Sequence, residues 1–334
     1  MNVRPTILCP VDYSDASGGA LRYAAALAGH FVTRLIVMTV EDPLLTAAMD
    51  FESGVPWSRE TSERELAAFV SKVFGEDDPA LSLCEYDVAV GKPPVEILRL
   101  ARERSCELIV MSSHGVTGAR KLFFGSTTER VLRETTVPVL VTPPVNPGPI
   151  RVADAKRLLK RIVVPLDLSA ASWHQTQVAT RLAEALHLPL VLLHVVEPVK
   201  SRLAARLRLT GLDASRRALA GETLDELVAT VPSHLLPEAL LVFGDPAEEA
   251  AKVVRDRHAG LLVIGLHGSP HTGPRMGSVT YRLLCLAPSL VLALPPSSAD
   301  VQRDVPASAS RAREDDFGNR AAAGPVAELH GAFL

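Results

Sequence analysis

The hexapeptide ILCPVD at residues 7–12 decides the fold, because it returns as IVVPLD at residues 162–167. Each copy is a short apolar run that ends in proline, an apolar residue and aspartate. In the first copy, residues at helical spacing follow, so the order of strand, turn and helix predicts the first unit of a parallel α/β domain. Because the copies start at residues 7 and 162, each half of the chain is long enough to bury its own core. The repeat therefore predicts a duplicated domain.

Other short motifs return in the same order. Gly91-Lys92-Pro93 is answered by Gly244-Asp245-Pro246, and SSHGVTG at residues 112–118 is answered by GLHGSPH at residues 265–271. Gly125-Ser126 is answered by Gly277-Ser278. We therefore predict an α/β fold of two tandem, doubly wound domains, each with a five-stranded parallel sheet.

Near-continuous apolar runs give the expected strands, and their lack of alternation is typical of a parallel sheet covered on both faces. The helices expected in the first half are Ser14–His30, Glu60–Phe74, Val95–Arg104 and about Thr127–Glu134. The strands expected are Thr6–Val11, Leu35–Val40, Glu85–Val90, Leu108–Met111 and Val137–Val141, then Arg161–Leu166, Leu190–Val196, Ala239–Val242, Leu261–Ile264 and Leu290–Leu294.

Changes in composition suggest the boundaries of the domains. Four prolines and a glycine at residues 143–149 indicate a linker. After Pro295-Pro296 the chain turns to Ser, Ala, Asp, Arg and Gly with little periodicity, which is typical of disorder. We expect a first domain at 1–145, a linker at 146–158, a second domain at 159–296 and a disordered tail at 297–334.

Bulk properties narrow the class of protein. The 334 residues carry 35 basic and 38 acidic side chains and a net charge of −3, so neither nucleic acid nor a membrane surface is the expected partner. No apolar run is long enough to span a membrane. The four cysteines form no Cys-x-x-Cys pair, so a reducing, cytoplasmic location is the simplest expectation.

A phosphate cradle is predicted at the carboxyl ends of the strands, where helices begin with unpaired amides. Gly115 is followed by nine residues and then Gly125-Ser126, which opens a helix. Glycines let the backbone approach a phosphate, and the helix start adds partial positive charge. The chain has no Walker loop and no dinucleotide fingerprint after its first strand, which disfavours a P-loop ATPase or a dehydrogenase.

These motifs together resemble the universal stress protein family, whose fold is Rossmann-like and related to the adenine nucleotide alpha hydrolases. The resemblance covers about Thr6–Thr142 and Arg161–Pro295. Nucleotide-binding members carry Gly-x2-Gly-x9-Gly-Ser/Thr, and here Ser112 stands in the place of the first glycine. The resemblance implies that ATP binds, with Mg²⁺ expected beside it. The implied nucleotide-binding residues are Asp12 for adenosine, Val40 through its backbone at the adenine edge, and Ser112, Gly115, Gly125, Ser126 and Thr127 for the phosphates.

The second half carries a weaker version of this site. Only eight residues separate Gly268 from Gly277-Ser278, and the loop between them contains Pro270 and Pro274, which lack an N–H. We predict that the first domain binds ATP better than the second. The residues of the weaker site are Asp167, Gly265, Gly268, Gly277 and Ser278.

Each candidate residue also has a purely structural explanation. Asp12 could form a turn or cap near Ser14, and Ser126 with Glu129 matches a helix capping box. We expect ligand contact at Asp12 because the loop motif accompanies it. His114 and His267 are expected as loop hydrogen-bonding residues, with no metal site predicted, and Arg120 and Lys121 as a solvated loop tip.

Three functions fit these patterns: an ATP-binding stress-response regulator, an enzyme that hydrolyses ATP slowly, and a nucleotide-free scaffold for unknown protein partners. No acid, base or lysine stands at a motif position in both halves, which disfavours catalysis. Single-domain family members pair through their last strands, so the resemblance implies an internal pseudo-dimer through Val137–Val141 and Leu290–Leu294. A homodimer of chains also fits. The sequence names neither the stress nor the partner.

Overall fold

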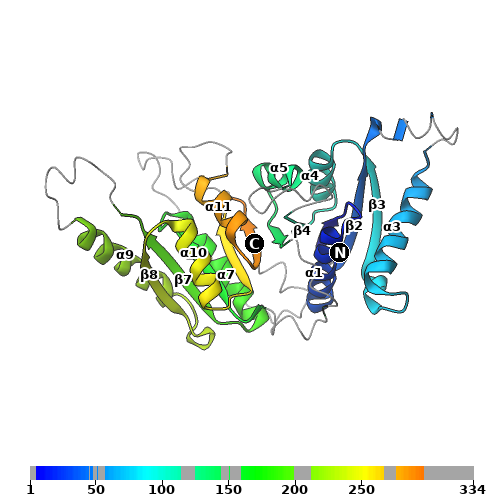
Figure 1. The fold of residues 1–334 in the computed structure, drawn as a ribbon. Helices are drawn as coiled ribbons and strands as arrows, with labels where there is room; N and C mark the ends of the chain where they lie inside the picture. Colours follow the sequence, from blue (N-terminus) through cyan, green and yellow to red (C-terminus); the bar gives the residue numbers. More distant parts are fainter. Residues whose placement is uncertain are drawn as a thin grey trace, which may run out of the picture.

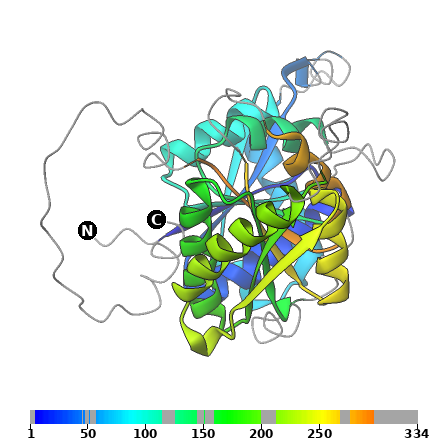
Figure 2. The ribbon, with the colours of Figure 1, turned by 90° about the vertical axis from the view of Figure 1, so that its left-hand side faces the viewer.

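The computed structural model describes residues 5–44, 46–47, 51, 57–113, 125–143, 150, 159–198, 212–266 and 276–296. These residues form two α/β halves of one design, side by side in Figure 1. Figure 2 turns the molecule so that the second half faces the viewer. The predicted α/β fold class is confirmed, because strands alternate with helices through both halves.

Ten strands of the described residues form one sheet, ordered β3-β2-β1-β4-β5-β10-β9-β6-β7-β8. Neighbours within each half run parallel, as the apolar runs predict, and one antiparallel pair joins the halves. The strands are β1 (Thr6–Pro10), β2 (Arg34–Glu41), β3 (Cys84–Val90), β4 (Leu108–Ser112), β5 (Val139–Thr142), β6 (Ile162–Leu166), β7 (Leu190–Val196), β8 (Glu238–Phe243), β9 (Leu261–Gly265) and β10 (Leu290–Leu294).

Helices cover both faces of the sheet and so bury its alternate residues on two sides. Ile7 and Cys9 belong to the core that α1, α3, α7 and α9 cover, and Leu8 belongs to the core that α4, α5, α10 and α11 cover. The helices are α1 (Asp15–Phe31), α3 (Arg59–Phe74), α4 (Pro93–Glu103), α5 (Ser126–Glu134), α7 (Ala171–Leu186), α9 (Leu212–Ala229), α10 (Pro246–Asp256) and α11 (Ser278–Leu286), with short 3-10 helices η1 (Pro79–Leu83) and η3 (Ser233–Leu235). Among the described residues, no helix is both long enough and apolar enough to cross a membrane.

The two halves meet where β5 pairs with β10. These strands run antiparallel, with Val141 opposite Val291. The predicted pairing of the last strands is therefore confirmed. The predicted start of β5 at Val137 is wrong by two residues, because the Thr135 hydroxyl donates to the Val137 carbonyl and accepts from the Val137 amide, which holds this stretch in a turn.

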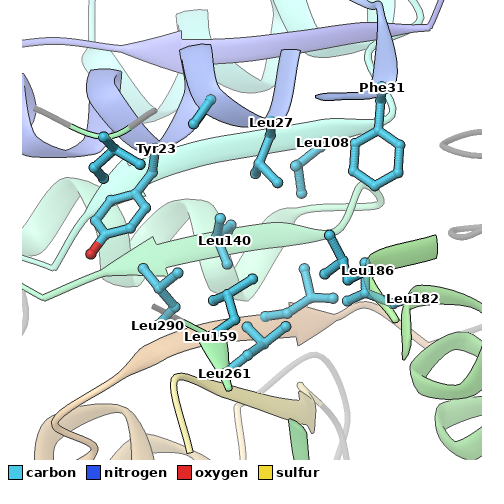
Figure 3. Close-up of a pocket in the computed structure, with 13 residues that line it drawn as sticks. Tyr23, Leu27, Phe31, Leu108, Leu140, Leu159, Leu182, Leu186, Leu261 and Leu290 are labelled. Atoms are coloured by element: carbon cyan, nitrogen blue, oxygen red, sulfur yellow. The ribbon is translucent and has the colours of Figure 1, made fainter. Parts of the chain in front are cut away.

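An apolar cavity of about 50 Å³ lies at this seam (Figure 3). Side chains of both halves line it, including Tyr23 and Phe31 of α1, Leu140 of β5, and Leu182 and Leu186 of α7. The helices α1 and α7 also approach each other here, with His30 Nε2 lying 3.4 Å from the Ala185 carbonyl oxygen. The seam is therefore a joint hydrophobic core with a small packing defect.

Candidate functional site

The candidate site lies at the carboxyl edge of the first half, where the strand order turns between β1 and β4. These two strands pair only at Ile7–Leu108 and Leu8–Ile109. Pro10 has no N–H to extend the pairing, so a gap opens toward the strand ends. Ligands of open α/β sheets bind at such a gap.

Asp12 follows β1 and forms a tight turn into α1. Its Oδ1 accepts hydrogen bonds from the Ser14 amide at 3.2 Å and the Ser14 hydroxyl at 2.5 Å. The Ser14 hydroxyl in turn accepts from the Ser17 amide at 3.1 Å and caps α1. The structural role considered for Asp12 is therefore present, and its side chain lies exposed at the edge of the sheet.

Tyr13, within this turn, has a φ of 62°, in the left-handed region that non-glycine residues seldom adopt. Its ring packs edge-on against Phe69, with 5.4 Å between the ring centres. Partial burial raises the pKa of the Tyr13 hydroxyl, and a hydrogen bond with Thr39 partly offsets that rise. Packing of the ring thus holds a strained backbone at the edge of the candidate site.

The second half repeats this turn. Asp167 Oδ1 accepts from the Ser169 amide at 2.9 Å and from the Ser172 hydroxyl at 3.0 Å. Leu168, the counterpart of Tyr13, has a φ of 60°. The role of these serines was not predicted, although Asp-x-Ser-x-x-Ser occurs at residues 12–17 and again at 167–172.

Val40 lies near the end of β2, beside the same gap. The pairing of β1 with β2 reaches Pro10–Met38, and the Val11 amide then donates to the Met38 carbonyl at 2.8 Å. Val40 is two residues further along, so its backbone on the β1 side has no strand next to it. This is the position at which a ligand would meet backbone donors and acceptors.

The helix α5 begins at the site with unsatisfied amides. Its N-cap is Gly125, which offers no side-chain oxygen, and its first intrahelical bond runs from the Glu129 amide to the Gly125 carbonyl. The expected capping box of Ser126 and Glu129 is wrong. Ser126 is the first helical residue rather than the cap, and the Glu129 carboxylate accepts from Arg133 at 2.7 Å.

Thr128 anchors this helix start to the sheet, a role that the sequence analysis assigned to no residue. Its buried hydroxyl donates to the Ser112 carbonyl at the end of β4, at 2.8 Å. In the second half, the Thr280 hydroxyl donates to the Gly265 carbonyl at 3.1 Å. The pattern Gly-Ser-x-Thr is present in both halves and could have revealed these threonines.

The helix α11 repeats the start of α5 in the second half. Its N-cap is Gly277, and Ser278 is its first residue. A Cβ added to Gly277 would meet the Thr280 hydroxyl oxygen at 3.8 Å as its nearest described neighbour, which is ordinary contact. The described protein packing therefore does not itself require glycine there.

A histidine marks one difference between the halves. His194 of β7 takes the place of Thr39 of β2, and its Nδ1 lies 2.8 Å from the Leu166 carbonyl oxygen. A carbonyl only accepts, so this nitrogen donates the hydrogen. The imidazole thus occupies a backbone acceptor directly before Asp167.

Several predicted residues lie outside the described part of the chain, so the structure places none of them. They are Gly115, Gly268, His114, His267, Arg120, Lys121, Pro270 and Pro274, together with the tail at 297–334. Of the first predicted site, the structure brings Asp12, Val40, Ser112, Gly125, Ser126 and Thr127 to one edge of the sheet. In the described ranges, no three His, Cys, Asp or Glu side chains are grouped to hold a metal ion.

Comparison with known proteins then assigns the family. The model of the universal stress protein family matches residues 4–143 and 159–295. The chain belongs to the universal stress protein family. Universal stress protein MJ0531 of Methanocaldococcus jannaschii is 28% identical over 140 residues, which are 42% of this chain and 82% of that protein. A universal stress protein of Thermus aquaticus is 31% identical over 138 residues, 41% of this chain and 96% of that protein.

Solved structures support the same fold over both halves of this universal stress protein. A universal stress protein from Archaeoglobus fulgidus aligns with a TM-score of 0.58 and 18% identity, covering 87% of this chain and 98% of that one. The protein PA1789 of Pseudomonas aeruginosa, described as functionally unknown, aligns with a TM-score of 0.59 and 16% identity over 90% and 96%. At these identities the likeness concerns the fold alone.

Proposed function

We propose that this universal stress protein is a stress-response regulatory module that binds ATP in its first half, residues 1–145. The observation that carries nucleotide binding is the start of α5, and the nine-residue spacing of Gly115 and Gly125, against eight in the second half, favours the first half. Its amides have no side-chain cap, and Thr128 ties them to the end of β4 beside the gap that Asp12 borders. Free amides, helix polarity and a nearby carboxylate form a set of groups suited to a phosphorylated ribose.

The proposed roles follow from the chemistry of each group. The Asp12 carboxylate accepts hydrogen bonds from ribose hydroxyls, and the backbone of Val40 meets the adenine edge. The amides of Ser126 and Thr127, with Ser112, Gly115 and Gly125, hold the phosphates, while the Gly125 amide itself donates to the Ser113 carbonyl at 2.9 Å.

The described residues fit Mg²⁺ that arrives with the nucleotide. Mg²⁺ commonly keeps several waters and binds substrate phosphates with one or two carboxylates, so it needs no protein cage. When bound, the ion would neutralise phosphate charge. The carboxylates of Asp12 and Glu41 lie at the described part of this edge, and that of Asp12 already accepts two hydrogen bonds from Ser14.

Binding at this position supports regulation more than catalysis. The nucleotide would join the β1–α1 turn, the end of β2 and the start of α5 into one rigid surface for a protein partner to recognise. The second half, residues 159–296, would then serve mainly as the structural partner of the first.

The test is calorimetric titration of Mg-ATP into the nucleotide-stripped protein, using Asp12→Asn and the matched Asp167→Asn. Asparagine keeps the turn, because its side-chain oxygen also accepts from the backbone, but it removes the charge. We expect one site per chain, weakened about tenfold by Asp12→Asn, the loss of one charged hydrogen bond, and unchanged by Asp167→Asn. Absence of binding, or loss only in Asp167→Asn, would contradict the proposal.

A further inference from the structure

The sharpest chemical difference between the halves lies on the first helix of each. Ala20 of α1 and Gln175 of α7 are equivalent, since each stands eight residues after the aspartate of its hexapeptide. Both side chains are buried. Ala20 presents a methyl group, whereas Gln175 presents an amide with two donor hydrogens.

Gln175 bridges the two central strands of its half. Its Nε2 donates to the Pro165 carbonyl of β6 at 3.0 Å and to the Val263 carbonyl of β9 at 2.9 Å. The paired part of β6 and β9 ends at Val163–Leu262, just before these carbonyls. One side chain therefore ties the strands together where their own pairing stops.

The proline of the hexapeptide explains why the bridge is needed. Continuing the parallel register by one step would bring the backbone nitrogen of residue 165 to the Val263 carbonyl. Residue 165 is proline and has no N–H to donate. The amide of Gln175 supplies the missing donor to the Val263 carbonyl, which would otherwise lose its partner within the sheet.

The first half has the same gap without the bridge. Pro10 and Val110 are the counterparts of Pro165 and Val263, and the strands stop pairing at the same register, Leu8–Ile109. Ala20 has no donor for their carbonyls, and no other side chain among the described residues donates to them. The gap between β1 and β4 is thus left unbridged at the point where Asp12 and Ser112 leave the sheet.

This inference rests on the proposed nucleotide site. We infer that the residue at this equivalent position, Ala20 in the first half and Gln175 in the second, selects which half binds nucleotide. Gln175 fixes the ends of β6 and β9 and fills the gap below Asp167 and Gly265. Ala20 leaves the gap below Asp12 and Ser112 open, so the strand ends can adjust to the adenosine moiety.

The experiment makes two separate variants of the full chain, Gln175→Ala and Ala20→Gln, and titrates each with Mg-ATP. Gln175→Ala is expected to add a second site, weaker than the first because its loop is one residue shorter and contains Pro270 and Pro274, and Ala20→Gln is expected to weaken the first site about tenfold or more. Asp12→Asn and Asp167→Asn introduced into each variant assign every site to its half. Gln175→Leu keeps the side-chain volume but removes the donors, so it separates the bridge from mere filling of space.

Backbone hydrogen-exchange rates, measured without ligand, report whether the Gln175 bridge holds the strand ends together and whether the variants fold. Gln175→Leu should speed exchange in peptides 162–168 and 261–266 and leave peptides 7–13 and 108–113 unchanged. Folded Ala20→Gln and Gln175→Ala proteins that bind ATP as the unaltered chain does would overturn the inference while the proposed function stands. Binding that appears only in Gln175→Ala would support the inference and overturn the proposed function. Absence of binding in every protein would overturn both.

Discussion

The two halves of the molecule have the same backbone conformation at equivalent turns, but they differ in the side chains at their strand ends. Tyr13 and Leu168 have φ of 62° and 60°, and Gly91 and Gly244 have φ of 155° and 153°. In this conformation a Cβ on Gly91 would lie 3.1 Å from the Glu96 side chain, and a Cβ on Gly244 would lie 2.8 Å from the Glu249 side chain. Both halves therefore use the same turns at equivalent places.

The divergence concerns groups that a ligand would use. His194 bonds the Leu166 carbonyl, whereas its counterpart Thr39 bonds the Tyr13 hydroxyl, and Gln175 bridges strands that Ala20 does not. Each change in the second half satisfies a backbone acceptor with a protein side chain. In the second half, side chains of the protein thus bond the carbonyls of Leu166, Pro165 and Val263 at the strand ends.

The largest effect on stability is expected from disrupting the pairing of β5 with β10, which joins the two halves. Leu140→Asp buries a carboxylate opposite Leu292 and should lower the free energy of unfolding by about 3–5 kcal/mol. Urea unfolding should then show two transitions, one for each half. Val90→Asp, at an exposed position on β3, is the control and should unfold like the unaltered chain. A single unchanged transition for Leu140→Asp would mean that the pairing of β5 with β10 does not join the halves.

The next effect separates the two helix starts. Gly125→Val should lower the affinity for Mg-ATP about 100-fold, because a side chain at the cap covers the first amides and removes about two charged hydrogen bonds. Gly277→Val should leave the affinity unchanged, and the described neighbours keep ordinary contact distance from a Cβ at Gly277. Calorimetry measures both. Equal losses would show that the halves bind nucleotide alike.

A smaller effect compares the two threonine anchors. Thr128→Val keeps the side-chain shape but removes the buried donor to the Ser112 carbonyl, at an expected cost of about 1–2 kcal/mol of unfolding free energy. Thr280→Val should cost less, because its bond is longer and only partly buried. Chemical unfolding of the two variants side by side gives the difference. A larger cost for Thr280→Val would reverse the order of the two anchors.

The smallest effect concerns acid sensitivity in the second half. Asp245 replaces Lys92 of the first half, and its pKa is lowered chiefly by a hydrogen bond from Arg282 at 2.7 Å. A lowered carboxyl pKa stabilises the fold above its ordinary value of 3.8, and that stabilisation is lost as the pH falls through the folded pKa.

Asp245→Asn should therefore flatten the fall of the melting temperature between about pH 5 and about pH 3. Lys92→Asn is the control and should keep the slope of the unaltered chain. Identical slopes in all three proteins would contradict the role of the Asp245–Arg282 pair.

The sequence predicted the duplicated α/β fold and the pairing of the last strands, because apolar runs and repeated turns are local signals. It also predicted Asp12 and Gly125 at one edge of the sheet, since the carboxyl ends of parallel strands converge. It did not reveal Gln175, because a glutamine on an apolar helix face shows its partners only once the strands around it are placed. The capping box at Ser126 failed for a related reason: the motif fits, but the helix starts one residue too early to use it.

The seam cavity has a consequence for how the molecule responds to compression. The pocket at the seam is partly open, and its unfilled apolar space of about 50 Å³ costs roughly 1 kcal/mol in lost packing. Unfolding eliminates such voids and so reduces the volume of the system, and hydrostatic pressure favours the smaller volume. Pressure should therefore part the halves at this joint before it disturbs the turns at Asp12 and Asp167, which are held by hydrogen bonds within a few residues of each other.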